Sequence, residues 1–239
     1  MTQRPFASVS AFVRARFSSE GYLGLHLTLG VLVLMLCAFI FSHIAKDVVT
    51  LDETTTLDLH LSQWFHSHAT WWLTQFMLLL THLHSTLGIL GLSVLLAIYW
   101  VRIKAWDWLI TLALTVPVGM LLNVLLKTIF QRTRPAFDTQ ILTLDSYSFP
   151  SGHAAAATLF YGVLAAWLIC TTSSWRWRVL IATLASLLVA LVGLSRIYLG
   201  VHYLSDVLAA VAASSGWLTF SLTAVAIWRR RRRVEQMKE

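Results

Sequence analysis

Long blocks of apolar residues dominate this chain of 239 residues, and they constrain its fold more than any other feature. About 20 consecutive apolar residues in a helix are enough to cross the hydrocarbon core of a bilayer. Hydrophobic residues make up 57% of the chain and charged residues only 12%, which is far too apolar for a soluble domain. The sequence therefore predicts an all-α, polytopic membrane protein.

Six apolar blocks predict six transmembrane helices. The second block is interrupted by the polar stretch 81–86, and we interpret it as one long or broken span because residues 72–80 alone are too short to cross. His82 and His84 in this interruption could line a groove for lipid headgroups. The predicted spans are Leu25–Ala45, Trp72–Val101, Trp106–Ile129, Ala154–Cys170, Val179–Leu194 and Asp206–Trp228.

We expect residues 1–239 to form a single membrane-embedded domain. It would consist of an arm (1–24), a six-helix core (25–228) and a basic tail (229–239). The polar segment 46–70 is ambiguous, because Leu57, Leu61 and Trp64 share a helical face whereas Leu57, Leu59 and Leu61 alternate as in a strand. We favour an interfacial helix, since lipid-exposed strand edges are disfavoured.

Basic residues cluster at one set of predicted helix ends. Most of the 18 Lys and Arg residues lie in the arm, in two short loops (102–104 and 176–178) and in the tail. The positive-inside rule then predicts that both termini of this multi-pass protein are cytoplasmic, in an inner (cytoplasmic) membrane. The net charge of +7 therefore indicates contact with the bilayer and not with nucleic acid. Cys37 and Cys170 are expected to be free.

The stretch Phe149-Pro150-Ser151-Gly152-His153 precedes an apolar run and predicts the start of a helix. A helix start offers unpaired N–H groups and the positive end of the helix dipole, so it suits an anion. Gly152 allows close approach of a ligand and His153 supplies a titratable group. These residues alone would also fit an N-cap beside an interfacial histidine.

Further charged residues lie at other predicted helix ends, at a similar depth in the membrane. Lys127, Arg134 and Arg196 can neutralise the oxygens of an anion, with the hydroxyl of Ser151 as a further donor. Arg102 and Arg132, in contrast, are expected to extend to the membrane interface without a functional role.

His202 and Asp206 are four residues apart and would share a face if the sixth helix began by His202. Asp206 could then hold one ring nitrogen and leave the other free as a nucleophile. All of these predicted site residues belong on the outer side of the membrane, the periplasmic or extracellular one.

Together the motifs resemble the type 2 phosphatidic acid phosphatase superfamily. Its signature is Lys with Arg-Pro seven residues later, then Pro-Ser-Gly-His, then Ser-Arg with His six and Asp ten residues after the Arg, and it is matched across roughly Trp106–Trp228. The resemblance implies a lipid phosphate phosphatase with His202 as nucleophile and His153 as general acid, without a metal or other cofactor. It also implies a phosphate-binding site formed by Lys127, Arg134, Ser151, Gly152 and Arg196.

The resemblance implies a membrane lipid phosphate as substrate: undecaprenyl pyrophosphate, phosphatidylglycerol phosphate, phosphatidic acid or a lipid A phosphate. We favour undecaprenyl pyrophosphate, because an outward-facing site suits recycling of that carrier. A lipid-to-lipid phosphotransferase and a non-catalytic lipid-binding or translocating protein remain alternatives. Vanadate-dependent peroxidase chemistry, found on related soluble folds, is disfavoured by the six spans. The sequence does not determine the oligomeric state.

Overall fold

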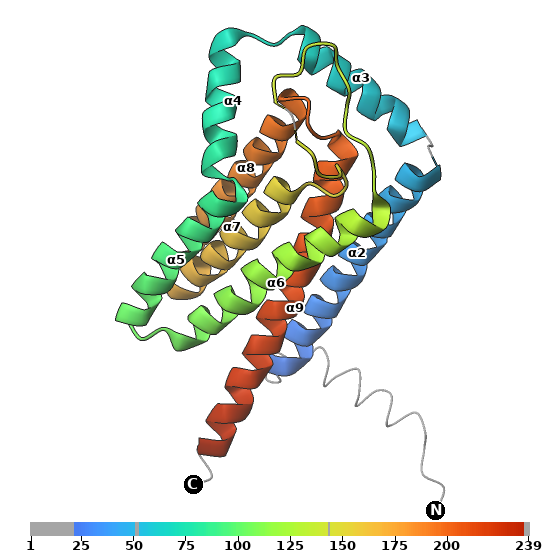
Figure 1. The fold of residues 1–239 in the computed structure, drawn as a ribbon. Coiled ribbons are helices and arrows are strands. Elements are labelled where there is room, and N and C mark those ends of the chain that lie inside the picture. The colour runs from blue at the N-terminus through green and yellow to red at the C-terminus, as the bar shows by residue number, and fades with distance from the viewer. Residues whose placement is uncertain (1–21, 51–52, 143, 237–239) are drawn as a thin grey trace, which may run out of the picture.

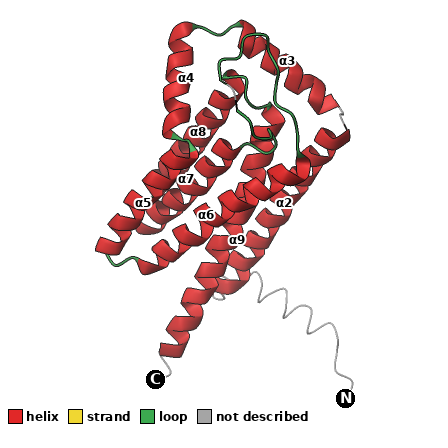
Figure 2. Cartoon of the chain, in the orientation of Figure 1, coloured by secondary structure: helices red, strands yellow, loops and turns green. Residues whose placement is uncertain are grey.

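The computed structural model describes residues 22–50, 53–142 and 144–236, and every regular element in these ranges is a helix (Figure 2). The predicted arm up to residue 21 and the last three residues of the tail lie outside the described residues. The helices are α2 (Tyr22–Thr50), α3 (Glu53–Ser67), α4 (Trp71–Leu83), α5 (Thr86–Arg102), α6 (Trp106–Phe130), α7 (Gly152–Thr171), α8 (Trp175–Tyr198) and α9 (Leu204–Gln236).

The predicted set of spans is confirmed. Five helices (α2, α6, α7, α8 and α9) are long and apolar enough to cross a membrane, and α4 with α5 forms a sixth candidate that bends by 53°. The apolar block that was predicted to be long or broken is thus two helices joined at a bend. Many large apolar side chains of α2, α5, α6 and α8 are exposed on the protein surface, as expected where a helix faces lipid.

The break between α4 and α5 has a local cause. Ser85 caps α5, because its side chain accepts a hydrogen bond from the backbone N–H of Gly88 at 3.2 Å. A Cβ atom at Gly88 would lie 2.1 Å from the carbonyl oxygen of Leu83, so only glycine fits this corner. The corner brings the polar residues Thr81 and His84 into the interior, where both are buried.

Helix α7 lies in the middle of the bundle and packs against α5, α6, α8 and α9 (Figure 1). Its first turns consist of the fully buried run 154–157, which is four alanines. Small side chains let neighbouring helices approach closely within a membrane. The same effect operates between α8 and α9, where a Cβ at Gly193 would lie 2.5 Å from Val207. This close packing fixes the ends of α7, α8 and α9 relative to one another.

Helix α3 crosses one end of the bundle, and the long loop 131–151 lies at the same end (Figure 1). The preference for a helix over a strand at residues 57–61 is thus confirmed. Asp58 and Ser62 on α3 are buried against the bundle, which packs α3 onto α2, α8 and α9. We call this end of the molecule the α3 end.

The beginning of α2 and the end of α9 both lie at the opposite end of the molecule (Figure 1). The arginine run does not leave the helix, because α9 continues to Gln236. Arg229 there forms an ion pair with Asp107 at 3.2 Å and lies over the ring of Trp108.

Candidate functional site

All the residues singled out by the sequence motifs lie at the α3 end. Lys127 is in the last turn of α6 and Arg196 in the last turn of α8. Gly152 begins α7, with Ser151 at the N-cap position. Asp206 is in the first turn of α9. Four helix ends therefore bring together residues that are up to 79 positions apart in the sequence, from 127 to 206.

The cations Lys127 and Arg134 are held by backbone carbonyl groups of the long loop. Lys127 Nζ donates to the carbonyl of Tyr147 at 2.6 Å, and Arg134 Nε donates to that of Ser146 at 2.7 Å. Among the described residues, neither cation is in an ion pair with a carboxylate, so their positive charge is available for an anion. Burial lowers the pKa of the Arg134 guanidinium, and a bound anion would favour its charged form.

Arg196 is the most deeply buried cation of the site, with 1% of its surface exposed. Its Nη1 donates to the Thr81 hydroxyl at the α4–α5 corner. Its Nε and Nη2, and the hydroxyl of Ser151, are buried and have no hydrogen-bond partner among the residues that the structure describes. Buried unpaired donors are costly, so these groups indicate a site that is completed by an acceptor such as a phosphate oxygen.

His202 is held from both sides of its ring. Its Nδ1 lies 3.3 Å from Asp206 Oδ2, and its Nε2 lies 3.2 Å from Arg134 Nη1. A guanidinium can only donate, so Nε2 is the unprotonated nitrogen and the proton resides on Nδ1 facing the carboxylate. The lone pair of Nε2 therefore points toward the cations of the site.

Burial lowers the pKa of His202 from its usual 6.5 to about 3, although the hydrogen bond and the charge of Asp206 act in the opposite direction. The imidazole is consequently neutral near pH 7. A neutral imidazole with a directed lone pair is the form that can act as a nucleophile.

The predicted pairing of His202 with Asp206 is present, but the expected helical spacing is not its cause. Helix α9 begins at Leu204, so His202 lies in the turn before it and not on the same helix face. The turn is closed instead by Asp206 itself, whose Oδ2 also accepts from the backbone N–H of Tyr203 at 2.9 Å. The N–H of His202 donates back to the carbonyl of Arg196 at 3.3 Å.

His153, in the first turn of α7, faces the same cluster. It interacts electrostatically with Arg196, His202 and Arg134. His84 also acts on His153 but does not line an open groove, because it is buried and its Nε2 lies 2.7 Å from the hydroxyl of Tyr161. Of the two histidines expected in a headgroup groove, only His82 is exposed.

The expectation that Arg132 simply extends to the membrane interface is wrong. Only 11% of its side chain is exposed, and it forms ion pairs with both Asp58 and Asp206. Burial alone would lower the pKa of Arg132, but the charges and hydrogen bonds of Asp206 and Asp58 raise it. Asp58, Arg132 and Thr81 are the polar residues of this region that sequence reasoning missed. Only the position of Arg132, two residues before Arg134, could have indicated from the sequence that Arg132 lies near the site.

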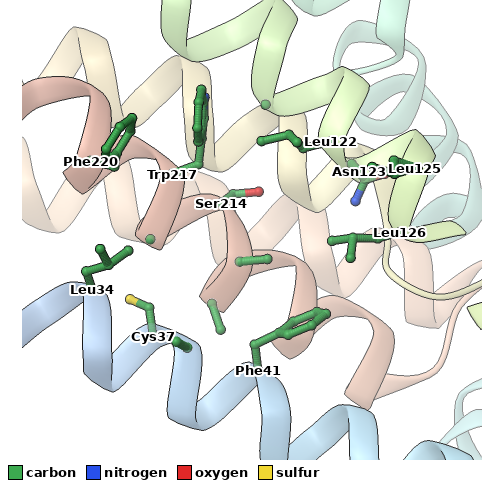
Figure 3. A pocket seen from close by; sticks show the side chains of 15 residues that line it. Leu34, Cys37, Phe41, Leu122, Asn123, Leu125, Leu126, Ser214, Trp217 and Phe220 are labelled. Atoms are coloured by element: carbon green, nitrogen blue, oxygen red, sulfur yellow. The ribbon is translucent and has the colours of Figure 1, made fainter. Parts of the chain in front are cut away.

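An apolar cavity of about 390 Å³ lies beside the site, between α2, α6 and α9. Leu34, Cys37 and Phe41 of α2 face Leu122 of α6 and Trp217 of α9 across it (Figure 3). The cavity adjoins the polar cluster at the start of α7. Asn123 lines the cavity, and a Cβ atom added to Gly152 would lie 3.5 Å from Asn123 Oδ1 and 3.8 Å from Lys127 Cε.

The fold and the site together define a class: a polytopic helical membrane protein with an unneutralised cation cluster, a directed histidine and an adjacent apolar cavity. Comparison with known proteins identifies the family. The profile of the PAP2 superfamily matches residues 108–232, just over half of the chain. The chain belongs to this superfamily.

Individual relatives agree with this assignment. Phosphatidylglycerophosphatase B of Bacillus subtilis is 36% identical over 154 residues, which is 63% of this chain and 73% of the relative. Undecaprenyl-diphosphatase of Sulfolobus acidocaldarius is 30% identical over 133 residues, covering 54% of this chain and 60% of the relative.

Two solved structures are similar in fold. The first is a transmembrane PAP2-type phosphatidylglycerolphosphate phosphatase from Bacillus subtilis, with a TM-score of 0.67 and 30% identity over 82% of this chain and 94% of that one. The second is LpxE of Aquifex aeolicus, with a TM-score of 0.57 and 25% identity over 70% of this chain and 94% of that one.

Proposed function

We propose that this protein hydrolyses the terminal phosphate of a membrane lipid phosphate or diphosphate through a phosphohistidine intermediate at His202. The observation that carries the proposal is the orientation of the His202 ring, with Nδ1 toward Asp206 and the Nε2 lone pair toward Arg134. Binding of a phosphate headgroup alone would need the cations but not a directed, neutral imidazole.

The phosphate group binds among Lys127, Arg134 and Arg196, with the N–H groups at the start of α7 as further donors. The unpaired Nε and Nη2 of Arg196 and the Ser151 hydroxyl then acquire acceptors. Because these donors are already in place before the reaction, they stabilise charge that develops on the equatorial oxygens without reorganisation.

In the first step Nε2 of His202 attacks phosphorus, a P–N bond forms and the bond to the leaving oxygen breaks. Protonated His153 gives its proton to that oxygen, and the negative phosphate bound next to His153 favours this protonated form. Asp206 accepts a hydrogen bond from Nδ1 and stabilises the positive ring.

In the second step a water molecule gives a proton to His153 and attacks phosphorus. The P–N bond breaks, and inorganic phosphate leaves. These steps use only side chains of this chain, so we propose that no metal ion is required.

The apolar cavity between α2, α6 and α9 supports a lipid substrate, since its polar edge at Asn123 adjoins Gly152. The relatives are named as a phosphatidylglycerophosphatase and an undecaprenyl-diphosphatase, so phosphatidylglycerol phosphate and undecaprenyl diphosphate are the two substrates that we would test first. An outward-facing site suits recycling of the prenyl carrier and favours the second.

The test is phosphate release by purified protein in detergent from phosphatidylglycerol phosphate, undecaprenyl diphosphate, phosphatidic acid and a lipid A phosphate. Each assay is run with and without EDTA, and His202→Ala is the control. We expect release from at least one lipid, unaffected by EDTA and lost in the variant. Equal release by His202→Ala would contradict the mechanism. Absence of release from every lipid would contradict hydrolysis and would lead to assays with an acceptor lipid for phosphotransfer.

A further inference from the structure

A group of mostly buried polar residues behind the His202–Asp206 pair takes no part in the steps above. It consists of Asp58 on α3, Arg132 in the long loop and Ser205 in the first turn of α9, with Asp206 as the link to the site. Asp58 is 2% exposed and Asp206 is fully buried. Two carboxylates so close together in the interior need a cation between them.

Arg132 is that cation, and it bridges the two carboxylates. Its Nη1 donates to Asp206 Oδ1 at 2.7 Å and its Nη2 donates to Asp58 Oδ2 at 2.9 Å. The guanidinium lies over the ring of Tyr203, with 4.2 Å from Cζ to the ring centroid. These three contacts together fix the orientation of the guanidinium.

Asp58 also caps helix α9 from a different helix. Its Oδ1 accepts from the backbone N–H of Ser205 at 3.0 Å, and its Oδ2 accepts from the Ser205 hydroxyl. The first N–H groups of a helix have no partner within the helix, and a carboxylate at this end is favoured by the helix dipole. Asp58 thus holds the beginning of α9, the turn of the helix that carries Asp206.

These contacts fix the orientation of the Asp206 carboxylate. Oδ1 is occupied by Arg132, while Oδ2 accepts from Tyr203 N and from His202 Nδ1. Rotation of the carboxylate away from His202 would break the ion pair with Arg132. Buried charge networks of this kind are often no better for stability than apolar packing, which favours a role in orienting the site.

We propose that Asp58 and Arg132 are positioning residues, which hold Asp206 so that the His202 lone pair points at the bound phosphate. Helix α3 is therefore part of the support of the reaction centre. This inference rests on the proposed function, because it concerns the rate of phosphoryl transfer to His202.

The variants Asp58→Asn, Arg132→Lys and Ser205→Ala test it. Asp58→Asn keeps the size of the side chain but removes the charge that holds Arg132, and we expect kcat to fall by about 10- to 100-fold, as for other partners that orient a reacting group. Arg132→Lys keeps the charge without the planar fork and should lower kcat less than Asp58→Asn. KM and the inhibition constant of inorganic phosphate should stay within about threefold, because the phosphate-binding cations are unchanged.

Asp107→Asn is the matched control, since it removes the carboxylate of another ion pair, with Arg229 at the opposite end of the molecule. Its kcat should equal that of the parent protein. Two measures separate a positioning effect from misfolding. Ser205→Ala is the mildest of the three variants. The kcat of each variant is also calculated per monodisperse protein molecule that phosphate stabilises against heat.

Three outcomes are decisive. A fall in kcat per folded molecule for Asp58→Asn at constant KM and phosphate affinity, without a change in Asp107→Asn, supports the inference. Unchanged kcat in folded Asp58→Asn, or a loss confined to KM, overturns it and leaves the proposed function in place. A parent protein that is inactive on every lipid overturns the proposed function, and the inference falls with it.

Discussion

At His202 a neutral imidazole is held between a carboxylate and a guanidinium, and each contact has a distinct effect. Asp206 lies beside Nδ1 and fixes the tautomer. Arg134 lies beside Nε2, so the free lone pair points toward this guanidinium. Burial keeps the ring unprotonated near pH 7. The chemistry we propose depends on this one side chain being neutral, oriented and adjacent to cations.

Asp206→Asn tests the orientation of that ring. The amide can present an N–H group to His202 Nδ1, which favours the wrong tautomer and removes the charge that stabilises the positive ring. We expect kcat to fall by about 10²- to 10⁴-fold with a small residual activity, as when the carboxylate of a triad is replaced. The measurement is steady-state phosphate release, and unchanged kinetics would show that the pairing has no role in the reaction.

The depressed pKa of His202 predicts a pH-dependent stability. The ring is harder to protonate in the folded than in the unfolded protein, so this contribution is fully present above pH 6.5 and is lost as the pH falls toward 3. Between pH 7 and pH 4.5 the loss amounts to about 2–3 kcal/mol, at about 1.4 kcal/mol per pKa unit. Thermal unfolding in detergent should therefore show a larger acid-induced drop in Tm for the parent protein than for His202→Gln. Equal drops would show that His202 titrates normally.

At the scale of helices, the positions of the site residues depend on the ends of the helices and on the α4–α5 corner more than on the middle of the spans. The α4–α5 corner delivers Thr81 to Arg196, the packing of α7 against α8 and α9 places the motifs side by side, and α3 closes the end of the bundle. The cavity between α2, α6 and α9 adjoins the polar cluster at Asn123.

Gly88→Ala tests the corner. The added Cβ would collide with the Leu83 carbonyl, so we expect a loss of about 1–3 kcal/mol of stability and lower activity. Gly91→Ala is the matched control in the same helix, where a Cβ meets no atom within 4 Å. It should be neutral or stabilising by up to about 1 kcal/mol. A Tm for Gly88→Ala equal to that of Gly91→Ala would contradict the close approach at the corner.

Ala38→Phe tests the cavity as a site for the lipid chain. Ala38 lines the cavity but is exposed, so a larger side chain narrows the cavity without disrupting buried packing. We expect about a tenfold higher KM for a long-chain lipid phosphate, with little change for a water-soluble phosphate monoester. Met35→Phe, on the same helix but outside the cavity lining, is the control. Equal effects on both substrates would argue against chain binding there.

Local sequence predicted the apolar helices, the interruption of the second apolar block and the clustering of the three motifs, because apolar length and the position of the motifs at the ends of apolar blocks indicate them. It did not predict where α9 begins, because the turn at His202 is held by a hydrogen bond from the backbone N–H of Tyr203 to the side chain of Asp206 and is not part of the helix. It also missed the bridge from Asp58 through Arg132 to Asp206. That bridge joins three segments distant in sequence, and only the packing of α3 onto α9 creates it.

For the whole molecule, both ends hold basic residues, but these residues have different roles. The α3 end holds the cations of the site, while the arginine run of α9 lies at the opposite end. The positive-inside rule then leads us to propose that the arginine run is cytoplasmic and that the site faces outward.

Cysteine labelling in intact cells tests this topology. In a background lacking Cys37 and Cys170, Gln140→Cys in the loop at the α3 end should react with an impermeant thiol reagent before lysis. Ser173→Cys, between α7 and α8 at the opposite end, should react only after lysis. Both positions are exposed, so access to the reagent depends on the side of the membrane. The reverse pattern would invert the proposed orientation.

The central claim, covalent transfer of phosphate to His202, is tested most directly by trapping the intermediate. The protein would be mixed with a lipid substrate carrying a labelled terminal phosphate, quenched in alkali within the first turnover and mapped by mass spectrometry. We predict an alkali-stable phosphoryl group on His202, absent from His202→Ala and increased when the attack of water is slowed. Label on another residue, or hydrolysis at full rate with no label at all on the chain, would contradict the account.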